Sequence, residues 1–158
     1  MERLKAVGGP VKIAKMSIFS WFKKAMDEAV VTDSHPVQAE ILVVEDSRDE
    51  MEFLCGLLRF QQAIVTRAYT IAGALEAIGG PTRFQLAFID LNLANSSAVE
   101  VVRRIKHSKR GTHPVVVSGD LEKIQLCLDW GYIGVLKKPY GIDSIRQVLK
   151  SHRLPTSD

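Results

Sequence analysis

Apolar residues recur in two alternating patterns along residues 39–150. Short continuous runs of bulky apolar residues have the length and composition of buried strands. Between these runs, apolar residues recur three or four positions apart, which is typical of helices with one buried face. The runs predict five strands, at residues 41–44, 63–68, 84–90, 114–118 and 132–136.

A helix is predicted after each of these strands. Ser47 with Glu50, and Ser97 with Glu100, have the spacing of capping boxes, and Thr70 can cap the helix between them. The apolar stripes of the helices fall at Phe53, Leu54, Leu57 and Leu58; at Ala98, Val101, Val102 and Ile105; at Leu121, Ile124 and Leu128; and at Ile142, Ile145, Val148 and Leu149.

Strict alternation of strands and helices predicts a parallel sheet with right-handed crossovers and helices on both faces. Five such units in about 115 residues are too few for an eight-stranded barrel. The predicted fold is therefore an α/β domain with a five-stranded, doubly wound, flavodoxin-like sheet. This domain is expected at residues 39–150, followed by a polar tail at residues 151–158.

Residues 1–38 form an N-terminal extension. Residues 17–30 are predicted to be an amphipathic helix, and residues 32–38 read as a linker. The favoured interpretation is an extra helix that packs on the domain or on a second copy. Its basic and aromatic residues also suit a membrane surface or a partner's groove, and these remain the alternatives.

Composition and charge narrow the class of protein. The chain has 158 residues, 46% of them hydrophobic, which is typical of a globular domain. Its net charge of +3 belongs largely to residues 1–24, so it argues only weakly for nucleic-acid binding by the main domain. No apolar run is long enough to span a bilayer. Cys55 and Cys127 lie far apart among apolar neighbours, which predicts reduced thiols and a cytoplasmic protein.

Four of the predicted strands end in polar groups: Glu45 with Asp46, Asp90, Ser118, and Lys138. The carboxyl ends of parallel strands meet at one edge of the sheet, where open α/β sheets place their chemistry. Carboxylates held together repel unless a cation intervenes, and oxygen ligands suit Mg²⁺. Each residue alone has an ordinary alternative as a turn or cap residue. Together they predict a site that transfers a phosphoryl group to a carboxylate.

With these motifs in order, residues 39–150 resemble the receiver domain of the two-component response-regulator family. The resemblance implies that Asp90 is the phosphoacceptor. It also implies that Glu45, Asp46, Asp90 and the backbone carbonyl of Asn92 bind Mg²⁺. Ser118 would hydrogen-bond the phosphoryl group, Lys138 would pair with it, and the bond before Pro139 would be cis. The expected donor is a sensor histidine kinase or a histidine phosphotransfer protein.

Three positions depart from the family's usual pattern. Ala94 and Ala98 stand where the family often has Pro and Gly after the phosphoacceptor. Val135 stands where an aromatic residue usually couples to the serine on the neighbouring strand. These departures bear on how the signal is read out and leave the phosphoacceptor itself in place.

The resemblance implies a receiver that catalyses only its own phosphorylation and dephosphorylation. No DNA-binding domain is expected after residue 150, so a stand-alone receiver acting through protein contacts, with a homodimer as one form, is the first hypothesis. The alternative is a degenerate receiver that binds partners independently of phosphorylation. A flavin or nucleotide enzyme is disfavoured, because the first strand lacks a glycine-rich phosphate loop.

Overall fold

The structure is a computed structural model that describes residues 38–93, 98–129, 131 and 134–157. The predicted helix at 17–30, most of the linker, and Ser97 of the second capping box lie outside the described residues. Within them, strands and helices alternate strictly along the chain, as predicted. The proposed domain limits at residues 39 and 150 stay a prediction.

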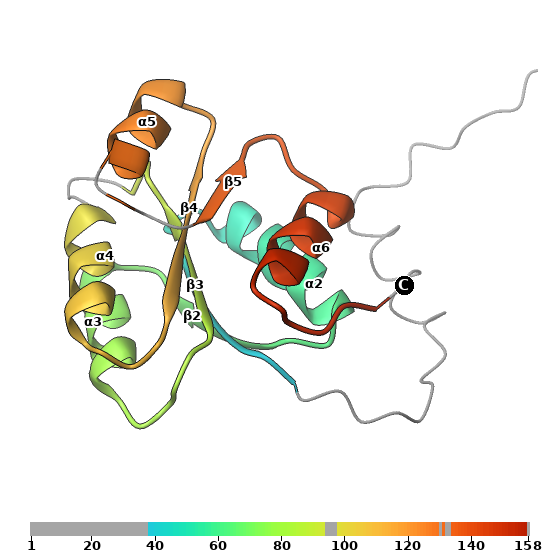
Figure 1. The fold of residues 1–158 in the computed structure, drawn as a ribbon, viewed down its shortest axis with the longest axis horizontal. Coiled ribbons are helices and arrows are strands. Elements are labelled where there is room, and N and C mark those ends of the chain that lie inside the picture. The colour runs from blue at the N-terminus through green and yellow to red at the C-terminus, as the bar shows by residue number, and fades with distance from the viewer. Residues whose placement is uncertain (1–37, 94–97, 130, 132–133, 158) are drawn as a thin grey trace, which may run out of the picture. The chain divides into compact units, whose positions relative to one another are not determined.

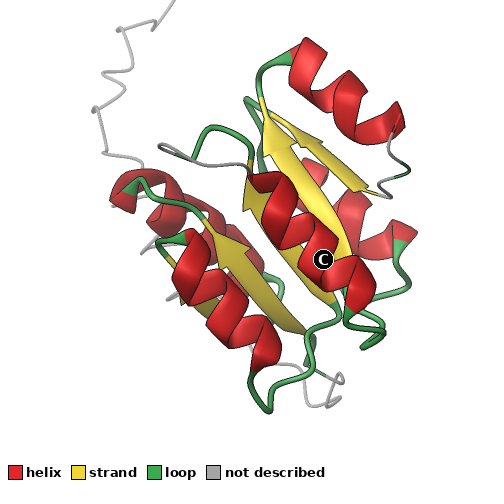
Figure 2. Cartoon of the chain, turned by 90° about the vertical axis from the view of Figure 1, so that its left-hand side faces the viewer, coloured by secondary structure: helices red, strands yellow, loops and turns green. Residues whose placement is uncertain are grey.

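A single parallel sheet contains the five strands β1 (Glu40–Val44), β2 (Ile64–Ala68), β3 (Leu86–Asp90), β4 (His113–Ser118) and β5 (Gly134–Lys137). Their order across the sheet is β2-β1-β3-β4-β5. The strand arrows all point the same way in Figure 2. The doubly wound fold class is confirmed.

In the described part of the chain, a helix follows each strand: α2 (Arg48–Phe60), α3 (Ile71–Gly79), α4 (Ala98–His107), α5 (Leu121–Asp129) and α6 (Ile142–Ser151). Figure 1 shows α2 and α6 on one side of the sheet and α3, α4 and α5 on the other. Side chains of successive strand residues point to opposite faces, so both faces of the central strands are buried. The domain therefore has three layers, with the sheet in the middle.

The core on the α3–α5 side explains why the central strands are apolar throughout. Leu42 and Ile89 belong to this core together with the predicted stripe of α4, all of which is buried. Ile41, Val43 and Phe88 occupy the alternate strand positions and are fully buried beneath the opposite helix layer. Burial of such a side chain contributes roughly 1.5–3 kcal/mol, so the two cores hold the sheet and its edges in place.

The predicted stripe of α5 is wrong in part. Ile124 is buried, but Leu121 and Leu128 are 62% and 44% exposed. Cys127 supplies the second buried position of this helix. The short helix turns one narrow face to the sheet, which leaves the rest of its apolar stripe at the surface.

The described part of the fifth strand runs from Gly134 to Lys137. Residues 132–133, where the strand was predicted to begin, lie outside the described part of the chain. Gly134 lies so close to β4 that a Cβ atom there would be 2.8 Å from Cγ2 of Val115. This close approach requires glycine at the start of the edge strand.

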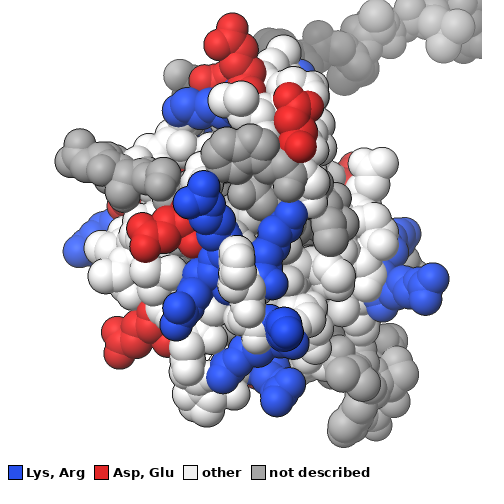
Figure 3. All heavy atoms as spheres, turned by 60° about the vertical axis from the view of Figure 1, so that its left-hand side comes forward, with Lys and Arg blue, Asp and Glu red and all other residues white. Residues whose placement is uncertain are grey.

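Lys and Arg side chains gather on the face that Figure 3 brings forward, where α4 lies. Arg103 and Arg104 on α4 and Lys109 just after it are exposed, and we call these three residues the cation face. None of their side chains has an ion-pair partner among the described residues. No helix in the described part of the chain is long and apolar enough to cross a membrane.

Candidate functional site

The carboxyl ends of four adjacent strands form the candidate site. The order β1-β3-β4-β5 places Glu45, Asp90, Ser118 and Lys138 at or just beyond consecutive strand ends. The register aligns Asp90 with Val117 on β4. These strand ends therefore lie side by side, as the sequence predicted.

Glu45, Asp46 and Asp90 form a compact acidic cluster. One carboxylate oxygen from each residue lies within 4.8 Å of the others. Glu45 and Asp90 are buried, whereas Asp46 is exposed. Oδ1 of Asp90 is buried and has no hydrogen-bond partner in the described residues. An all-oxygen set with an unsatisfied buried acceptor fits a hard divalent cation such as Mg²⁺ or Ca²⁺.

Lys138 provides the positive charge of the site. Its Nζ lies 3.2 Å from Oδ1 of Asp90 and 3.9 Å from Oε2 of Glu45. The peptide bond between Lys138 and Pro139 is cis, as the family resemblance implied. The backbone N–H of Lys138 donates to the carbonyl of Ser118 at 2.9 Å, which fixes the end of β5 against β4.

Burial and crowding shift the acidities of these groups. Desolvation, assisted by the charge of Asp90, raises the pKa of Glu45 to about 7, although the backbone of Ser47 and the charge of Lys138 oppose this. Desolvation also raises the pKa of Asp90 against the opposing effect of Lys138. Desolvation disfavours the charged form of Lys138, but hydrogen bonding to Glu50 and the charge of Asp90 outweigh it and raise the pKa. The cluster thus contains more carboxylate than one ammonium group can neutralise.

Ser118 and Asn92 lie at the margins of the cluster. Ser118 is fully buried, and its Oγ accepts a hydrogen bond from the backbone N–H of Asp120 at 3.0 Å. The backbone N–H of Asn92 donates to Oδ2 of Asp90 at 3.2 Å. The roles predicted for the Ser118 hydroxyl and the Asn92 carbonyl stay predictions.

Two contacts of the site were missed from the sequence. Lys123 on α5 donates to Oδ1 of Asn92 at 2.8 Å, which ties the loop after β3 to α5. Glu50 on α2 forms an ion pair with Lys138. Glu50 was assigned to a capping box, and its distance from Lys138 in the sequence gives no signal of this contact.

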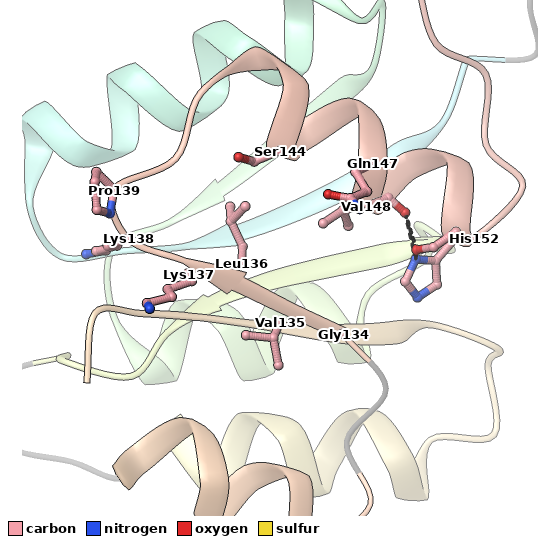
Figure 4. Close-up of a pocket in the computed structure, with 11 residues that line it drawn as sticks. Gly134, Val135, Leu136, Lys137, Lys138, Pro139, Ser144, Gln147, Val148 and His152 are labelled. Carbon is pink, nitrogen blue, oxygen red and sulfur yellow. Dashed lines mark hydrogen bonds between the residues drawn. The ribbon is translucent and has the colours of Figure 1, made fainter. Parts of the chain in front are cut away.

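Val135 and the groove beside it occupy the outer edge of the sheet. Val135 is half-buried and packs against the core on the α3–α5 side. A groove of about 660 Å³ lies between β5 and α6. Figure 4 shows Lys138 at one end of this groove and His152 at the other. The groove therefore begins beside the acidic cluster and follows the edge strand away from it.

Solved structures similar to this chain have the same fold. The chemotaxis protein CheY4 of Vibrio cholerae is 22% identical with a TM-score of 0.66, over 73% of this chain and 98% of that one. A response regulator from Burkholderia pseudomallei, solved with a phosphorylated aspartic acid, a calcium ion and citrate, is 22% identical with a TM-score of 0.63. That match covers 71% of this chain and 66% of the other.

Sequence comparison extends the similarity to a much larger protein. Histidine kinase 2 of Arabidopsis thaliana is 28% identical over 90 residues, which are 57% of this chain but only 8% of the kinase. The response regulator receiver domain family matches residues 41–150. This range contains the whole sheet beyond Glu40 and every residue of the acidic cluster. The chain thus belongs to the response regulator receiver domain family, whose members receive signals in two-component systems.

Proposed function

We propose that Asp90 accepts a phosphoryl group from a phosphohistidine and that the phosphorylated receiver signals through protein contacts. The observation that carries the proposal is Oδ1 of Asp90, a buried carboxylate oxygen without a hydrogen bond, 3.2 Å from Nζ of Lys138. A buried charge without such a bond is costly unless the site uses it. The phosphorylated aspartic acid in the similar Burkholderia protein supports this proposal.

In the proposed reaction, a carboxylate oxygen of Asp90 attacks phosphorus, and an oxygen–phosphorus bond forms. The bond between phosphorus and the histidine nitrogen of the donor breaks, and the nitrogen keeps the electron pair. Lys138 neutralises charge on the phosphoryl oxygens, and the Ser118 hydroxyl donates a hydrogen bond to one of them. The receiver thus needs no separate substrate beyond the phosphoryl donor.

Glu45, Asp46, Asp90 and the backbone carbonyl of Asn92 would hold the divalent cation, with Mg²⁺ as the proposed ion. When bound, the cation offsets the negative charge of the cluster and of the phosphoryl oxygens. Desolvation and, after it, the charge of Asp90 raise the pKa of Glu45, and a bound cation would oppose both effects. Glu45 and Asp90 would hold the cation as the buried members of the cluster, and Asp46 would hold it as the exposed member.

The test is labelling by acetyl phosphate with Mg²⁺, followed by intact-protein mass spectrometry. The wild-type chain should gain the mass of one phosphoryl group, and Asp90→Asn should gain none. Asp49→Asn is the matched control, because Asp49 is exposed on the same edge and lies outside the acidic cluster. An unlabelled wild type, or a labelled Asp90→Asn protein, would refute the proposal.

The proposed partners are a histidine kinase or phosphotransfer protein on the donor side and a protein target downstream. The groove between β5 and α6 supports a target contact there, because it begins at Lys138 and would respond to a charge placed on Asp90. Self-association through the N-terminal segment is a further proposed contact. The free thiols of Cys55 and Cys127 support the proposed cytoplasmic location.

Val135 favours a second candidate function, a receiver fold that binds partners without phosphorylation. Val135 is half-buried against the core and lacks the aromatic ring that a switch residue at this position would move. This candidate predicts partner binding that is equal in the wild type and Asp90→Asn. Binding that depends on prior labelling of the wild type would exclude it.

A further inference from the structure

Glu50 is the unexpected member of the site. It lies in the first turn of α2, where its backbone N–H donates to Oγ of Ser47 at 3.4 Å. In a capping box its carboxylate would accept the backbone N–H of Ser47 in return. That N–H instead donates to Oε1 of Glu45 at 3.0 Å. The capping box is therefore only half formed, and the Glu50 carboxylate is available for another partner.

That partner is the ammonium group of Lys138. The pair joins residues 88 positions apart and connects α2 to the segment after β5. Asp90 also lies within ion-pair distance, with its Oδ1 3.2 Å from Nζ of Lys138, but the contact with Glu50 is the shorter of the two. Glu50 and the nucleophile therefore share the charge of one ammonium group.

The contact between α2 and the segment after β5 has an apolar component beside this ion pair. The rings of Phe53 and Tyr140 pack with their centroids 5.7 Å apart. The nearby Glu50 charge, after desolvation, contributes to raising the pKa of Tyr140. The ion pair and the ring pair therefore lie in one interface between α2 and the segment after β5.

We propose that Glu50 is a positioning residue. Its carboxylate pairs with the ammonium group of Lys138, competes with the site for that charge, and so slows phosphorylation of Asp90. This inference rests on the proposed function of Asp90. A phosphoryl group adds about −2 charge next to Lys138 and outcompetes the single charge of Glu50. Lys138 then turns to the phosphoryl group, and the Glu50 carboxylate is released at the surface of α2. Release of this contact between α2 and the segment after β5 changes the α2 surface only in the phosphorylated protein.

The test compares labelling rates by acetyl phosphate and Mg²⁺ in wild type, Glu50→Gln and Asp49→Asn. Removing the competing carboxylate should raise the rate about three- to tenfold, as expected for breaking a partly buried ion pair. Asp49→Asn removes the same charge from the same helical turn and should stay within about twofold. Equal rates for Glu50→Gln and wild type, or an equal rise in Asp49→Asn, would overturn the inference.

A second measurement is independent of phosphorylation. Thermal unfolding in EDTA is compared for Glu50→Gln, Lys138→Met and the double variant. If the two residues act as a pair, the double variant loses less Tm than the sum of the two single losses. Additive losses would show that Glu50 does not act through Lys138. An unlabelled wild type would refute the function of Asp90, whereas this cycle would still decide whether the pair exists.

Discussion

The acidic cluster and the cation face both bring like charges together, but under opposite conditions. Glu45 and Asp90 are buried at the carboxyl edge of the sheet, where desolvation raises the pKa of both. Arg103, Arg104 and Lys109 lie in solvent on and just after α4, without an ion pair among the described residues. Water and salt screen the exposed charges, so they need no partner. The buried carboxylates repel one another, and a bound cation would offset this repulsion.

The largest effect is expected from pH in the absence of divalent cations. Between the unfolded pKa of Glu45, near 4.5, and its folded pKa of about 7, the folded state binds more protons than the unfolded state. The free energy of unfolding should therefore fall as pH rises through this window, by roughly 2–3 kcal/mol. Urea unfolding in EDTA at pH 5 and pH 7.5 measures the change.

Addition of Mg²⁺ supplies the control for this pH effect. If the cation holds the carboxylates in their ionised form, the fall in stability should largely disappear in excess Mg²⁺. A fall of the same size with and without Mg²⁺ would show that the acidic cluster is not a cation site.

A smaller effect should come from replacing one positively charged side chain beside the acidic cluster and one on the cation face. Lys138→Met leaves the buried carboxylates without their ammonium partner and should lower the free energy of unfolding by about 1–3 kcal/mol at pH 8 in EDTA. Arg103→Met is the matched control, and its change should stay within about 0.5 kcal/mol. Similar losses in both variants would contradict the contrast between buried and exposed charge.

The smallest effect concerns the cation face itself. Replacing both Arg103 and Arg104 by Glu relieves like-charge repulsion and should change the free energy of unfolding by a few tenths of a kcal/mol at most. This change should vanish in 1 M NaCl because salt screens exposed charges. A salt-independent loss above about 1 kcal/mol would mean that these arginines have a structural role.

The fold was predictable because buried parallel strands are apolar at every position. The strand at 41–44 was recognised for this reason and the α4 stripe from Ala98 to Ile105 by its helical spacing, and both are buried. The prediction for α5 was wrong in part, because Leu121 and Leu128 have the spacing of core residues but lie at the surface. Hydrophobic spacing identifies a helix, but tertiary packing decides how much of its apolar face is covered.

The part of the site that could be predicted from the sequence is the part that the order of the parallel strands brings together. Strand order brings Glu45, Asp90 and Lys138 together, because the carboxyl ends of parallel strands share an edge. The Glu50 contact depends on which oxygen satisfies the N–H of Ser47, a choice between Glu45 and Glu50 that sequence spacing does not decide. The sequence therefore predicted the site residues whose position depends on the order of the strands. It missed Glu50, whose contact depends on which side chain accepts the N–H of Ser47.

The distance in sequence between Lys138 and the cluster has a consequence during synthesis. A chain emerging from the ribosome exposes Glu45, Asp46 and Asp90 well before Lys138, and the ion pair to Glu50 closes a loop of 88 residues. On the proposed function, an incomplete receiver has its nucleophile but lacks its counter-charge. We therefore expect a chain that ends before Lys138 to be a poor phosphoryl acceptor.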